Sequence, residues 1–400
     1  MANVSSSNGL EKYPKLRFKG FSEPWEHVKL SDFVSRVTRK NSDNQTDIPL
    51  TISSKDGLIN QNEFFSKQVA SKDMSGYYLL QRGEFAYNKS YSVGFDFGSI
   101  KRLEKYDQGA LSTLYICFAL DRFDSDFIKH YFDSLKWYRE IYMISAEGAR
   151  NHGLLNVPTE DFFATLHTLP MDAAEQRKIA ELLDLLTAKI EKQQSLVDNL
   201  KKYKRGFLQA SFSSQDDWNT YPISSLGKVV TGSTPPTDNP ENYGGDELFC
   251  APSDVGSEKY ISSTIKRVSE KGFHTGRIVP KGTIIVTCIG LIGKLGIATQ
   301  DMITNQQINS LIVNDAFDNE FIYYALEFAL PRYAAQASMQ TMPILSKSEF
   351  EKITLQIPNI KRQKEISQPL ALLDNKIANQ ALVLENLIAL KNGLLQKLFI

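Results

Sequence analysis

Residues 175–212 read EQRKIAELLDLLTAKIEKQQSLVDNLKKYKRGFLQASF, and residues 362–399 read RQKEISQPLALLDNKIANQALVLENLIALKNGLLQKLF. Aligned without a gap, at the offset of 187 residues that joins Gln176 to Gln363, the two segments contain 15 identical pairs among 38. A repeat this far apart is not the short period of a solenoid. It indicates that a whole unit, a domain followed by a long helix, occurs twice in the chain.

Each of these segments carries an apolar seam. Apolar residues recur at alternating steps of four and three, the heptad spacing of helices that pair as a coiled coil. Both seams are interrupted at the same two places, by Gln193 and Gln380 and by Lys204 and Lys391. Because the interruptions match, we predict two helices, each about 60 Å long, that pair antiparallel with each other instead of each packing only on its own domain. The predicted pairing residues are Ile179, Leu183, Leu186, Ile190, Leu200, Ile366, Leu370, Leu373, Ile377 and Leu387.

The repeat extends beyond the helices and sets the domain organisation. Trp25 opens the first unit and Trp218 opens the second, and each unit closes on a proline, Pro170 or Pro358, just before its long helix. Between these landmarks, short β-rich runs predominate and the two units diverge. The sequence predicts an α+β chain with pseudo-two-fold symmetry, two mixed globular domains being separated by the long helices. The expected segments are a polar N-terminal tail and lead-in (1–22), domain 1 (23–170), the central helix (171–214), domain 2 (215–358) and the C-terminal helix (359–400).

Composition excludes several classes of protein. Lys plus Arg and Asp plus Glu both number 46, so the formal net charge is zero, which argues against a chain that grips nucleic acid unaided. Three cysteines, far apart and odd in number, form neither a disulfide framework nor a metal site and suit a reducing cytoplasm. Residues 1–9 lack the pattern of a signal peptide, and the apolar runs are too short to cross a bilayer.

Motifs of catalysis are missing from the sequence. The string Gly290-Leu291-Ile292-Gly293-Lys294-Leu295 has the wrong spacing for a phosphate-binding loop and is predicted to be a β-turn. The five histidines are scattered without the paired spacing of a metal site. We therefore predict a binding function and neither catalytic nor metal-ligating residues.

Several strings resemble those of specificity subunits of Type I restriction-modification systems. Each long helix opens with Gln-x-x-Ile-x-x-x-Leu-x-x-Leu-x-x-Lys-Ile and ends with Lys-x-Gly-x-Leu-Gln-x-x-Phe, and these helices are the specific part of the resemblance. The second unit adds strings similar to those of the family's target recognition domains, among them Gly232-Ser233-Thr234-Pro235, Tyr243-Gly244-Gly245 and Thr304-Asn305-Gln306. The loop Cys288-Ile289-Gly290-Leu291 departs from the more conventional strings of the family.

The resemblance implies a function for the whole chain. Each domain would read one half of a split site on double-stranded DNA, and the helices would set the number of unread base pairs between the halves. The helices would also dock two adenine-methylating modification subunits, and two motor-nuclease restriction subunits can join such complexes. S-adenosylmethionine, ATP and Mg²⁺ would be bound by those partners, not by this chain, which would catalyse nothing in a prokaryotic cytoplasm.

Candidate DNA-binding residues follow from the chemistry of base readout, in which Arg and Lys contact guanine and Asn and Gln contact adenine. In the first unit they surround a glycine-containing hairpin: Asn88, Lys89, Tyr91, Lys101 and Arg102. In the second unit they are Ser233, Thr234, Tyr243, Lys294, Asn305 and Gln306, with Lys271, His274 and Arg277 as candidate phosphate contacts. For any one of them, a solvated turn or a turn cap is an equally good interpretation. The densest basic run, residues 201–205, is either a wet helix face or a contact for DNA or an acidic partner.

Two other functions remain open at the level of sequence. A stand-alone bivalent DNA-binding protein would bind DNA without partner subunits. A bivalent scaffold for proteins or glycans would show no affinity for DNA even with partners present. Both would use the same doubled architecture.

Overall fold

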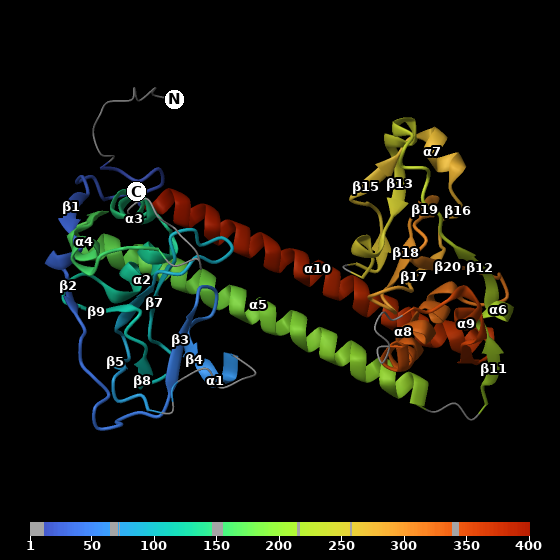
Figure 1. The fold of residues 1–400 in the computed structure, drawn as a ribbon, viewed down its shortest axis with the longest axis horizontal. Coiled ribbons are helices and arrows are strands. Elements are labelled where there is room, and N and C mark those ends of the chain that lie inside the picture. Colours follow the sequence, from blue (N-terminus) through green and yellow to red (C-terminus); the bar gives the residue numbers. More distant parts are fainter. Residues whose placement is uncertain are drawn as a thin grey trace. The chain divides into compact units, whose positions relative to one another are not determined.

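The computed structural model describes residues 12–64, 71, 73–145, 155–213, 217–256, 258–337 and 344–400. The chain divides into two compact units. Unit 1 consists of Met1–Lys192 and Leu384–Ile400, and unit 2 consists of Gln193–Val383. Each unit contains strands, short helices and parts of two long helices (Figure 1), which confirms the predicted α+β class.

Unit 1 contains two four-stranded sheets and a separate strand pair in its described part. The strands are β1 (Glu26–Lys29), β2 (Val34–Arg36), β3 (Pro49–Ser53), β4 (Gly57–Asn60), β5 (Tyr78–Gln81), β6 (Phe85–Asn88), β7 (Ser99–Arg102), β8 (Gln108–Leu111), β9 (Ile116–Leu120) and β10 (Leu166–Leu169). The short helices are η1 (Leu30–Asp32), α1 (Gln61–Phe64), α2 (Ser125–Asp133), α3 (Tyr138–Ile144) and α4 (Thr159–Ala164). The sheets run β2-β9-β6-β7 and β4-β3-β8-β5, and β1 pairs with β10.

Unit 2 contains a five-stranded sheet, a four-stranded sheet and a strand pair in its described part. The strands are β11 (Asn219–Pro222), β12 (Gly227–Thr231), β13 (Tyr243–Cys250), β14 (Tyr260–Ile261), β15 (Lys266–Val268), β16 (Ile278–Val279), β17 (Ile284–Thr287), β18 (Leu295–Ala298), β19 (Met302–Thr304), β20 (Ile308–Val313) and β21 (Thr354–Ile357). Besides the long helices, the helices are α6 (Ile223–Leu226), η2 (Pro240–Asn242), η3 (Pro252–Asp254), α7 (Glu270–Thr275), α8 (Asn319–Ala337) and α9 (Lys347–Lys352). The sheets run β12-β20-β17-β18-β14 and β15-β13-β19-β16, and β11 pairs with β21.

Two long helices, α5 (Ala173–Ser213) and α10 (Ile360–Leu398), carry the predicted seam. Every predicted pairing residue on them is buried or half-buried. Within unit 2 the helices meet directly, because the Gln193 side-chain amide donates to the backbone carbonyl of Gln380 at 2.8 Å and to its side-chain oxygen at 2.9 Å. The matched polar interruptions therefore face each other and satisfy each other's hydrogen bonds.

The frame around each long helix is repeated in detail. In unit 1, Gln176 accepts a hydrogen bond from the Asp124 backbone N–H at 2.8 Å and donates one to the Pro170 carbonyl at 2.8 Å. In unit 2, Gln363 accepts from the Asp318 N–H at 2.8 Å and donates to the Pro358 carbonyl at 2.9 Å. Both glutamines are buried. Each therefore clasps the start of its long helix to the first turn of a domain helix, α2 or α8.

Each unit's core is completed by the start of one long helix and the end of the other. Ile179 and Leu183 at the start of α5 share the core of unit 1 with Leu395 and Phe399 at the end of the chain. The matched residues Ile366, Leu370, Leu208 and Phe212 share the core of unit 2. Since the beginning of one helix meets the end of the other in both cores, the pairing within each unit is antiparallel.

The N-terminal lead-in is attached to unit 1. Residues 1–11 of the predicted tail lie outside the described residues, but residues 12–22 make definite contacts. Arg17 forms an ion pair with the buried carboxylate of Glu175 at 2.7 Å, and Trp25 Nε1 donates to the same carboxylate at 3.3 Å. The Leu16 N–H donates to the carbonyl of Lys397 at 2.9 Å. This part of the segment therefore packs against both long helices and does not form a free tail.

Candidate nucleic-acid interface

Two loops of unit 2 lie against each other and bring together several predicted DNA-binding residues. The loop after β12 begins with Gly232, whose N–H donates to the Ile308 carbonyl at 3.0 Å. The next N–H, of Ser233, donates to the Thr304 carbonyl at 2.7 Å. A Cβ at Gly232 would lie 2.1 Å from the Asn305 carbonyl oxygen, so only glycine permits this approach. The loop is consequently held against the turn that joins β19 to β20.

The side chains of this loop pair present polar groups at the surface. The Thr234 hydroxyl donates to the side-chain oxygen of Gln306, and both residues are exposed. Asn305 instead caps its own turn, because its Oδ1 accepts from the Gln307 N–H at 3.0 Å. Thr234 and Gln306 therefore offer hydrogen-bonding groups to a partner, whereas Asn305 holds the turn that displays them.

Arg277 and Tyr243 fix the same loop. The Arg277 N–H donates to the Ser233 hydroxyl at 3.0 Å, and its guanidinium donates to the Thr231 carbonyl at 2.9 Å. The Tyr243 hydroxyl donates to the Pro235 carbonyl at 2.7 Å. Arg277 is exposed, and its contact with the Thr231 carbonyl leaves other N–H groups of the guanidinium for a partner. The structure thus joins Arg277, which was predicted as a phosphate contact, to the predicted base readers.

The two other candidate phosphate contacts lie on α7. Lys271 forms an exposed ion pair with Glu241, which lowers the pKa of that carboxyl group. His274 is exposed and packs edge-on against Phe273, with ring centroids 5.8 Å apart. Because the charge of Lys271 is already compensated, the ion pair would have to open before the ammonium could contact a phosphate.

Lys294 lies at the end of the loop between β17 and β18, where the sequence predicted a turn. The loop is anchored to the β19–β20 turn, because the Cys288 N–H donates to the Gln307 carbonyl at 2.9 Å. The Lys294 N–H donates to the Thr287 hydroxyl at 3.0 Å. No ion pair of its ammonium group is formed with any other residue that the structure describes. Lys294 therefore has a free positive charge beside the loop pair.

In unit 1 the predicted hairpin lies between β6 and β7. Asn88 is half-buried and its Oδ1 accepts from the Ser90 N–H at 3.0 Å, and the Lys89 carbonyl accepts from the Leu155 N–H at 3.0 Å. Tyr91 projects outward with 56% of its surface exposed. A Cβ at Gly98 would lie 2.0 Å from the Asn88 carbonyl oxygen, so the base of the hairpin requires glycine. Of these residues, Tyr91 presents the most surface to a partner.

Lys101 and Arg102 are engaged in intramolecular ion pairs that attach β7 to α2. Lys101 Nζ lies 2.7 Å from Asp133 Oδ1 at one end of α2. The Arg102 guanidinium lies 2.6 Å from Asp126 Oδ1 at the other end, and 2.7 Å from Glu104 Oε1. Their role in DNA binding stays a prediction, and their observed contacts stabilise the unit. The structure does not bring them together with Tyr91 on an open surface.

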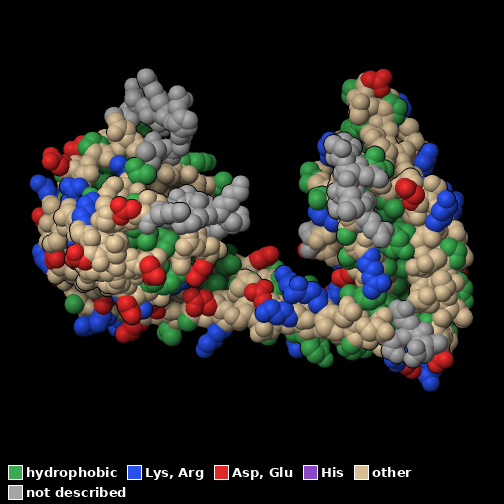
Figure 2. All heavy atoms as spheres, turned by 60° about the horizontal axis from the view of Figure 1, so that its bottom comes forward, with side chains coloured by type: hydrophobic (Ala, Val, Ile, Leu, Met, Phe, Trp, Pro, Cys, Tyr) green, Lys and Arg blue, Asp and Glu red, His purple; other side chains and the backbone are tan. Residues whose placement is uncertain are grey.

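Surface charge agrees with the neutral composition. Figure 2 shows Lys and Arg side chains interspersed with Asp and Glu over the visible faces of the units, without a broad basic surface. Among the residues that the structure describes, no group of three or more His, Cys, Asp or Glu could hold a metal ion. The described helices also include none that is long and apolar enough to cross a membrane.

A second set of surface residues was missed by the sequence analysis, which considered only the seam. Outside the seam, α5 and α10 carry apolar side chains that point to solvent at positions 187 residues apart. The matched pairs and their exposed fractions are Leu185 (71%) and Leu372 (69%), Leu196 (41%) and Val383 (42%), and Tyr203 (62%) and Leu390 (53%). At about 100° per residue, the three positions on each helix fall on one face. We call each set the outer stripe. The apolar character of both copies at these offsets was a signal available in the sequence.

Comparison with known proteins found a matching family and related sequences for the second part of the chain. Residues 215–388 match the family described as "Type I restriction modification DNA specificity domain". The MjaIX specificity subunit of Methanocaldococcus jannaschii is 32% identical over 170 residues, which are 41% of this chain and 39% of that protein. The HindI specificity subunit of Haemophilus influenzae is 31% identical over 175 residues, 41% of this chain and 38% of that protein. The matches thus span about two fifths of the length of these relatives.

Solved structures extend the likeness to the fold of nearly the whole chain. A structure described as the S subunit of a Type I restriction-modification system from M. genitalium covers 97% of this chain and 99% of that chain, with a TM-score of 0.63 and 15% identity. A chain from a study of complex assembly and conformational transition of the Type I system covers 94% of this chain and 97% of that chain, with a TM-score of 0.54. At this low identity the likeness establishes the fold alone.

Proposed function

We propose that the chain is the DNA sequence-specificity subunit of a Type I restriction-modification complex. Its second unit matches the specificity family in sequence, and nearly the whole chain shares the fold of a solved S subunit. Each unit reads one half of a bipartite site in double-stranded DNA. The chain itself catalyses nothing, and the complex acts in the cytoplasm, where the chromosome is.

The loop pair of unit 2 supports the readout of bases. Hydroxyl and amide groups on Thr234 and Gln306 are exposed side by side, and the free ammonium of Lys294 lies on a loop anchored to the same turn. Amide, hydroxyl and ammonium groups on protruding loops are suited to the hydrogen-bonding edges of bases in the major groove. In unit 1 the exposed Tyr91 occupies the corresponding candidate surface.

The repeated frame supports a bipartite site. The clasps of Gln176 and Gln363 and the helix ends that close each core recur in both units, whereas the loops between them differ in length and sequence. A frame that is repeated in both units and carries different loops is suited to two different half-sites. We propose that the long helices set the number of unread base pairs between these halves.

The outer stripes support the docking of two copies of one partner, and they are the observation that carries the proposal. Apolar side chains that remain exposed at matched positions of two helices form two equivalent patches, and exposed apolar patches mark interaction sites. A single partner protein that binds one stripe would find the same chemistry on the other. We propose that these partners are two adenine methyltransferase subunits that bind S-adenosylmethionine. Two ATP- and Mg²⁺-dependent motor-nuclease subunits can then complete a restriction complex.

Co-expression with an adenine methyltransferase subunit of a Type I system from the same organism tests the function. We expect single-molecule sequencing of DNA from cells that express both proteins to reveal methylated adenines in one two-part sequence. Methylation without a shared bipartite sequence, or none at all, would contradict the proposal.

Variants of the stripes test the docking separately. Replacing Leu185, Leu196 and Tyr203 by serine on α5 should reduce the methyltransferase content from two copies to one, because one apolar patch is lost. The matched α10 variant, with serine at Leu372, Val383 and Leu390, should do the same, and the combined variant should retain none. Native mass spectrometry gives the stoichiometry. Two retained copies in the combined variant would show that the stripes are not the docking sites.

A further inference from the structure

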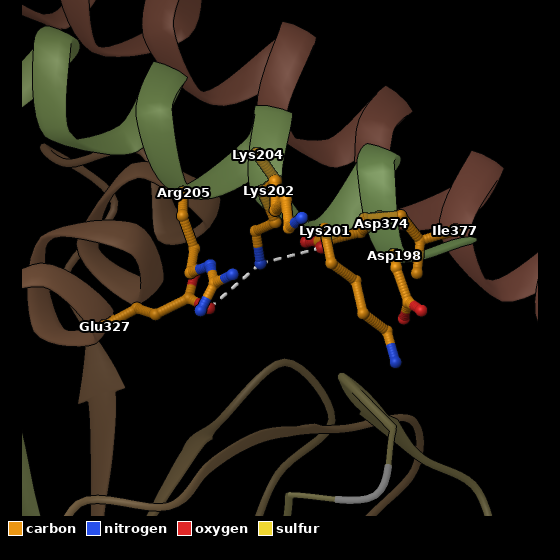
Figure 3. A pocket seen from close by; sticks show the side chains of 8 residues that line it. All are labelled: Asp198, Lys201, Lys202, Lys204, Arg205, Glu327, Asp374 and Ile377. Carbon is orange, nitrogen blue, oxygen red and sulfur yellow. Dashed lines mark hydrogen bonds and ion pairs between the residues drawn. The ribbon is translucent and has the colours of Figure 1, made fainter. Parts of the chain in front are cut away.

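Unit 2 contains a hollow that is lined by both acidic and basic side chains. It has a volume of about 540 Å³ and is lined by residues of α5, α8 and α10 (Figure 3). The lining residues are Asp198, Lys201, Lys202, Lys204, Arg205, Glu327, Asp374 and Ile377. Four of these eight side chains are basic, and all four belong to residues 201–205, the densest basic run of α5.

Two of the three carboxylates that line the hollow, Glu327 and Asp374, form ion pairs. Lys204 Nζ lies 2.9 Å from Glu327 Oε1 and 2.7 Å from Asp374 Oδ1, as the dashed lines in Figure 3 mark. Asp374 also accepts a hydrogen bond from the Tyr324 hydroxyl at 2.6 Å and lies 3.6 Å from Lys259 Nζ. Glu327 and Asp374 are therefore both engaged by Lys204, and the ion pairs that they form lie with Lys204 and Lys259.

Lys201, Lys202 and Arg205 remain free at the rim. All three are exposed, and their charged groups form no hydrogen bond or ion pair with another residue in the described part of the chain. Asp198, the nearest acidic residue on their own helix, accepts from the Gln194 amide at 3.1 Å. The rim therefore carries three cationic side chains that form no ion pair with a described residue, which we call the basic cluster. In Figure 3 the side chain of Lys201 extends away from α5.

The basic cluster and the outer stripe occupy different faces of α5. At about 100° per residue, each member of the cluster lies at least about 100° around the helix from Tyr203. A protein docked on the stripe through Leu196 and Tyr203 therefore leaves the cluster accessible.

The cluster also breaks the repeat. The positions on α10 that match Lys201, Lys202 and Arg205 are Ile388, Ala389 and Asn392. A partner that docks twice would need the same groups on both helices, as the stripes provide. The cluster thus suits a partner that is met on α5 alone.

The chemistry of the cluster points to a phosphate backbone. Lysine is depleted in protein–protein interfaces, whereas phosphate contacts depend on Lys and Arg. Lys201 and Arg205 are four residues apart, which corresponds to about 6 Å along the helix axis at 1.5 Å per residue. This separation is close to two nucleotide steps along one DNA strand, at about 3.4 Å per step. We propose that the basic cluster contacts the backbone of the DNA duplex that unit 2 reads; this inference rests on the proposed function.

Lys294 connects the cluster to the candidate reading loops within unit 2. Its side-chain carbons pack on Gly256, where an added Cβ would lie 3.1 Å from Lys294 Cδ. A few residues along the same loop, Lys259 reaches Asp374 in the lining of the hollow. We expect a duplex that is bound at Thr234 and Gln306 to meet both the ammonium of Lys294 and the basic cluster, which would add sequence-independent contacts.

Salt-dependent DNA binding tests the inference. The probe is a fluorescent duplex of random sequence, measured with the full chain in complex with its methyltransferase. Each phosphate contact contributes about 0.9 to the slope of log affinity against log salt concentration. The triple variant K201Q/K202Q/R205Q should lower the magnitude of that slope by about 2 to 3, and R205Q alone by about 1. The preference of the complex for the bipartite sequence that the methylation experiment identifies, relative to the random duplex, should not change, because backbone contacts carry no sequence information.

Matched variants separate the outcomes. The charge-conserving variant K201R/K202R/R205K should keep the slope of the parent, and K352Q/K361Q, which removes two exposed charges elsewhere in unit 2, should keep it as well. If the parent complex binds DNA and the triple variant retains its slope, the inference is overturned while the proposed function stands. Loss of the methyltransferase from the triple variant would also overturn it, by making the cluster a protein contact. A parent complex without DNA affinity would instead refute the proposed function.

Discussion

His167 is buried in unit 1 between two neutral partners. Its Nδ1 lies 2.8 Å from the Tyr131 hydroxyl and its Nε2 lies 2.9 Å from the Thr165 hydroxyl. Burial lowers the pKa of His167 to about 3, because no carboxylate compensates a charged ring. The side chain therefore stays neutral in the folded protein at pH values where it becomes protonated in the unfolded chain.

This difference predicts that acid destabilises unit 1. The unfolded histidine has a pKa of about 6.5, so the stability that depends on the neutral ring is complete above that pH and is lost as the pH falls from there toward 3. The slope per buried histidine is at most about 1.4 kcal/mol per pH unit. Replacing His167, the buried second residue of β10, by leucine, the buried second residue of β21 (Leu355), should flatten the dependence of unfolding free energy on pH. Denaturant titrations between about pH 7 and about pH 4 measure it.

His130 contributes to the slope that remains after His167 is replaced. Burial lowers its pKa as well, in spite of its 2.8 Å contact with Asp184. The His167→Leu variant should therefore keep part of the slope. A variant that retains all of it would contradict the assignment to His167.

At the level of residues, the sequence supplied the candidate DNA-binding residues but not which of them would be engaged in contacts within the protein. Ser233, Thr234, Asn305 and Gln306 do meet, because glycine and turn residues on both strings allow a close approach. The environment of Arg102 was not predictable, since its carboxylate partner Asp126 lies on a different element, α2. Ion pairs of this kind depend on tertiary packing, which a local pattern does not contain.

At the level of elements, the long helices were predictable and the sheets were not. The heptad period repeats over many turns, so it identified the buried side of α5 and α10 directly. The strands are short, and pairings such as β13 with β19 join segments far apart in the chain. Strand preference depends on such tertiary neighbours more than on local sequence. Because the strands are short and the loops that join them differ from one unit to the other, the sequence did not predict which strands pair or in what register.

The glutamine clasps make a prediction about the helix starts. Replacing Gln176 by leucine removes the acceptor of the Asp124 N–H and the donor to the Pro170 carbonyl, and it should lower the unfolding free energy of unit 1 by about 1–3 kcal/mol. Gln363→Leu should have the same effect on unit 2, because it makes the same two bonds. Thermal or chemical unfolding measures both. Gln209, which is identical in the repeat but exposed, is the control, and its leucine variant should change stability by less than about 0.5 kcal/mol.

At the level of the whole molecule, the two cores depend on distant parts of the chain. Phe399, the penultimate residue, packs on Phe127 and Tyr131 of unit 1, with ring centroids 5.4 and 5.9 Å apart. Its match in the repeat, Phe212, packs on Phe321 of unit 2 at 5.3 Å. Unit 1 is therefore closed by the C-terminal end of the chain, and unit 2 by the end of α5. The duplication thus places equivalent anchors in both units.

These two phenylalanines allow the independence of the units to be measured. Phe399→Ala should destabilise unit 1, and Phe212→Ala should destabilise unit 2, each by about 3–5 kcal/mol, because each leaves a cavity in a closed core. Hydrogen exchange read by mass spectrometry reports both units in one experiment, and each variant serves as the control for the other. We expect faster exchange in the core strands of the substituted unit, such as β9 for Phe399 and β17 for Phe212, with the other unit unchanged. Equal loss of protection in both units after either substitution would mean that the chain unfolds as a single cooperative body. In that case, one unit could not be replaced by the unit of another protein without affecting the stability of the other.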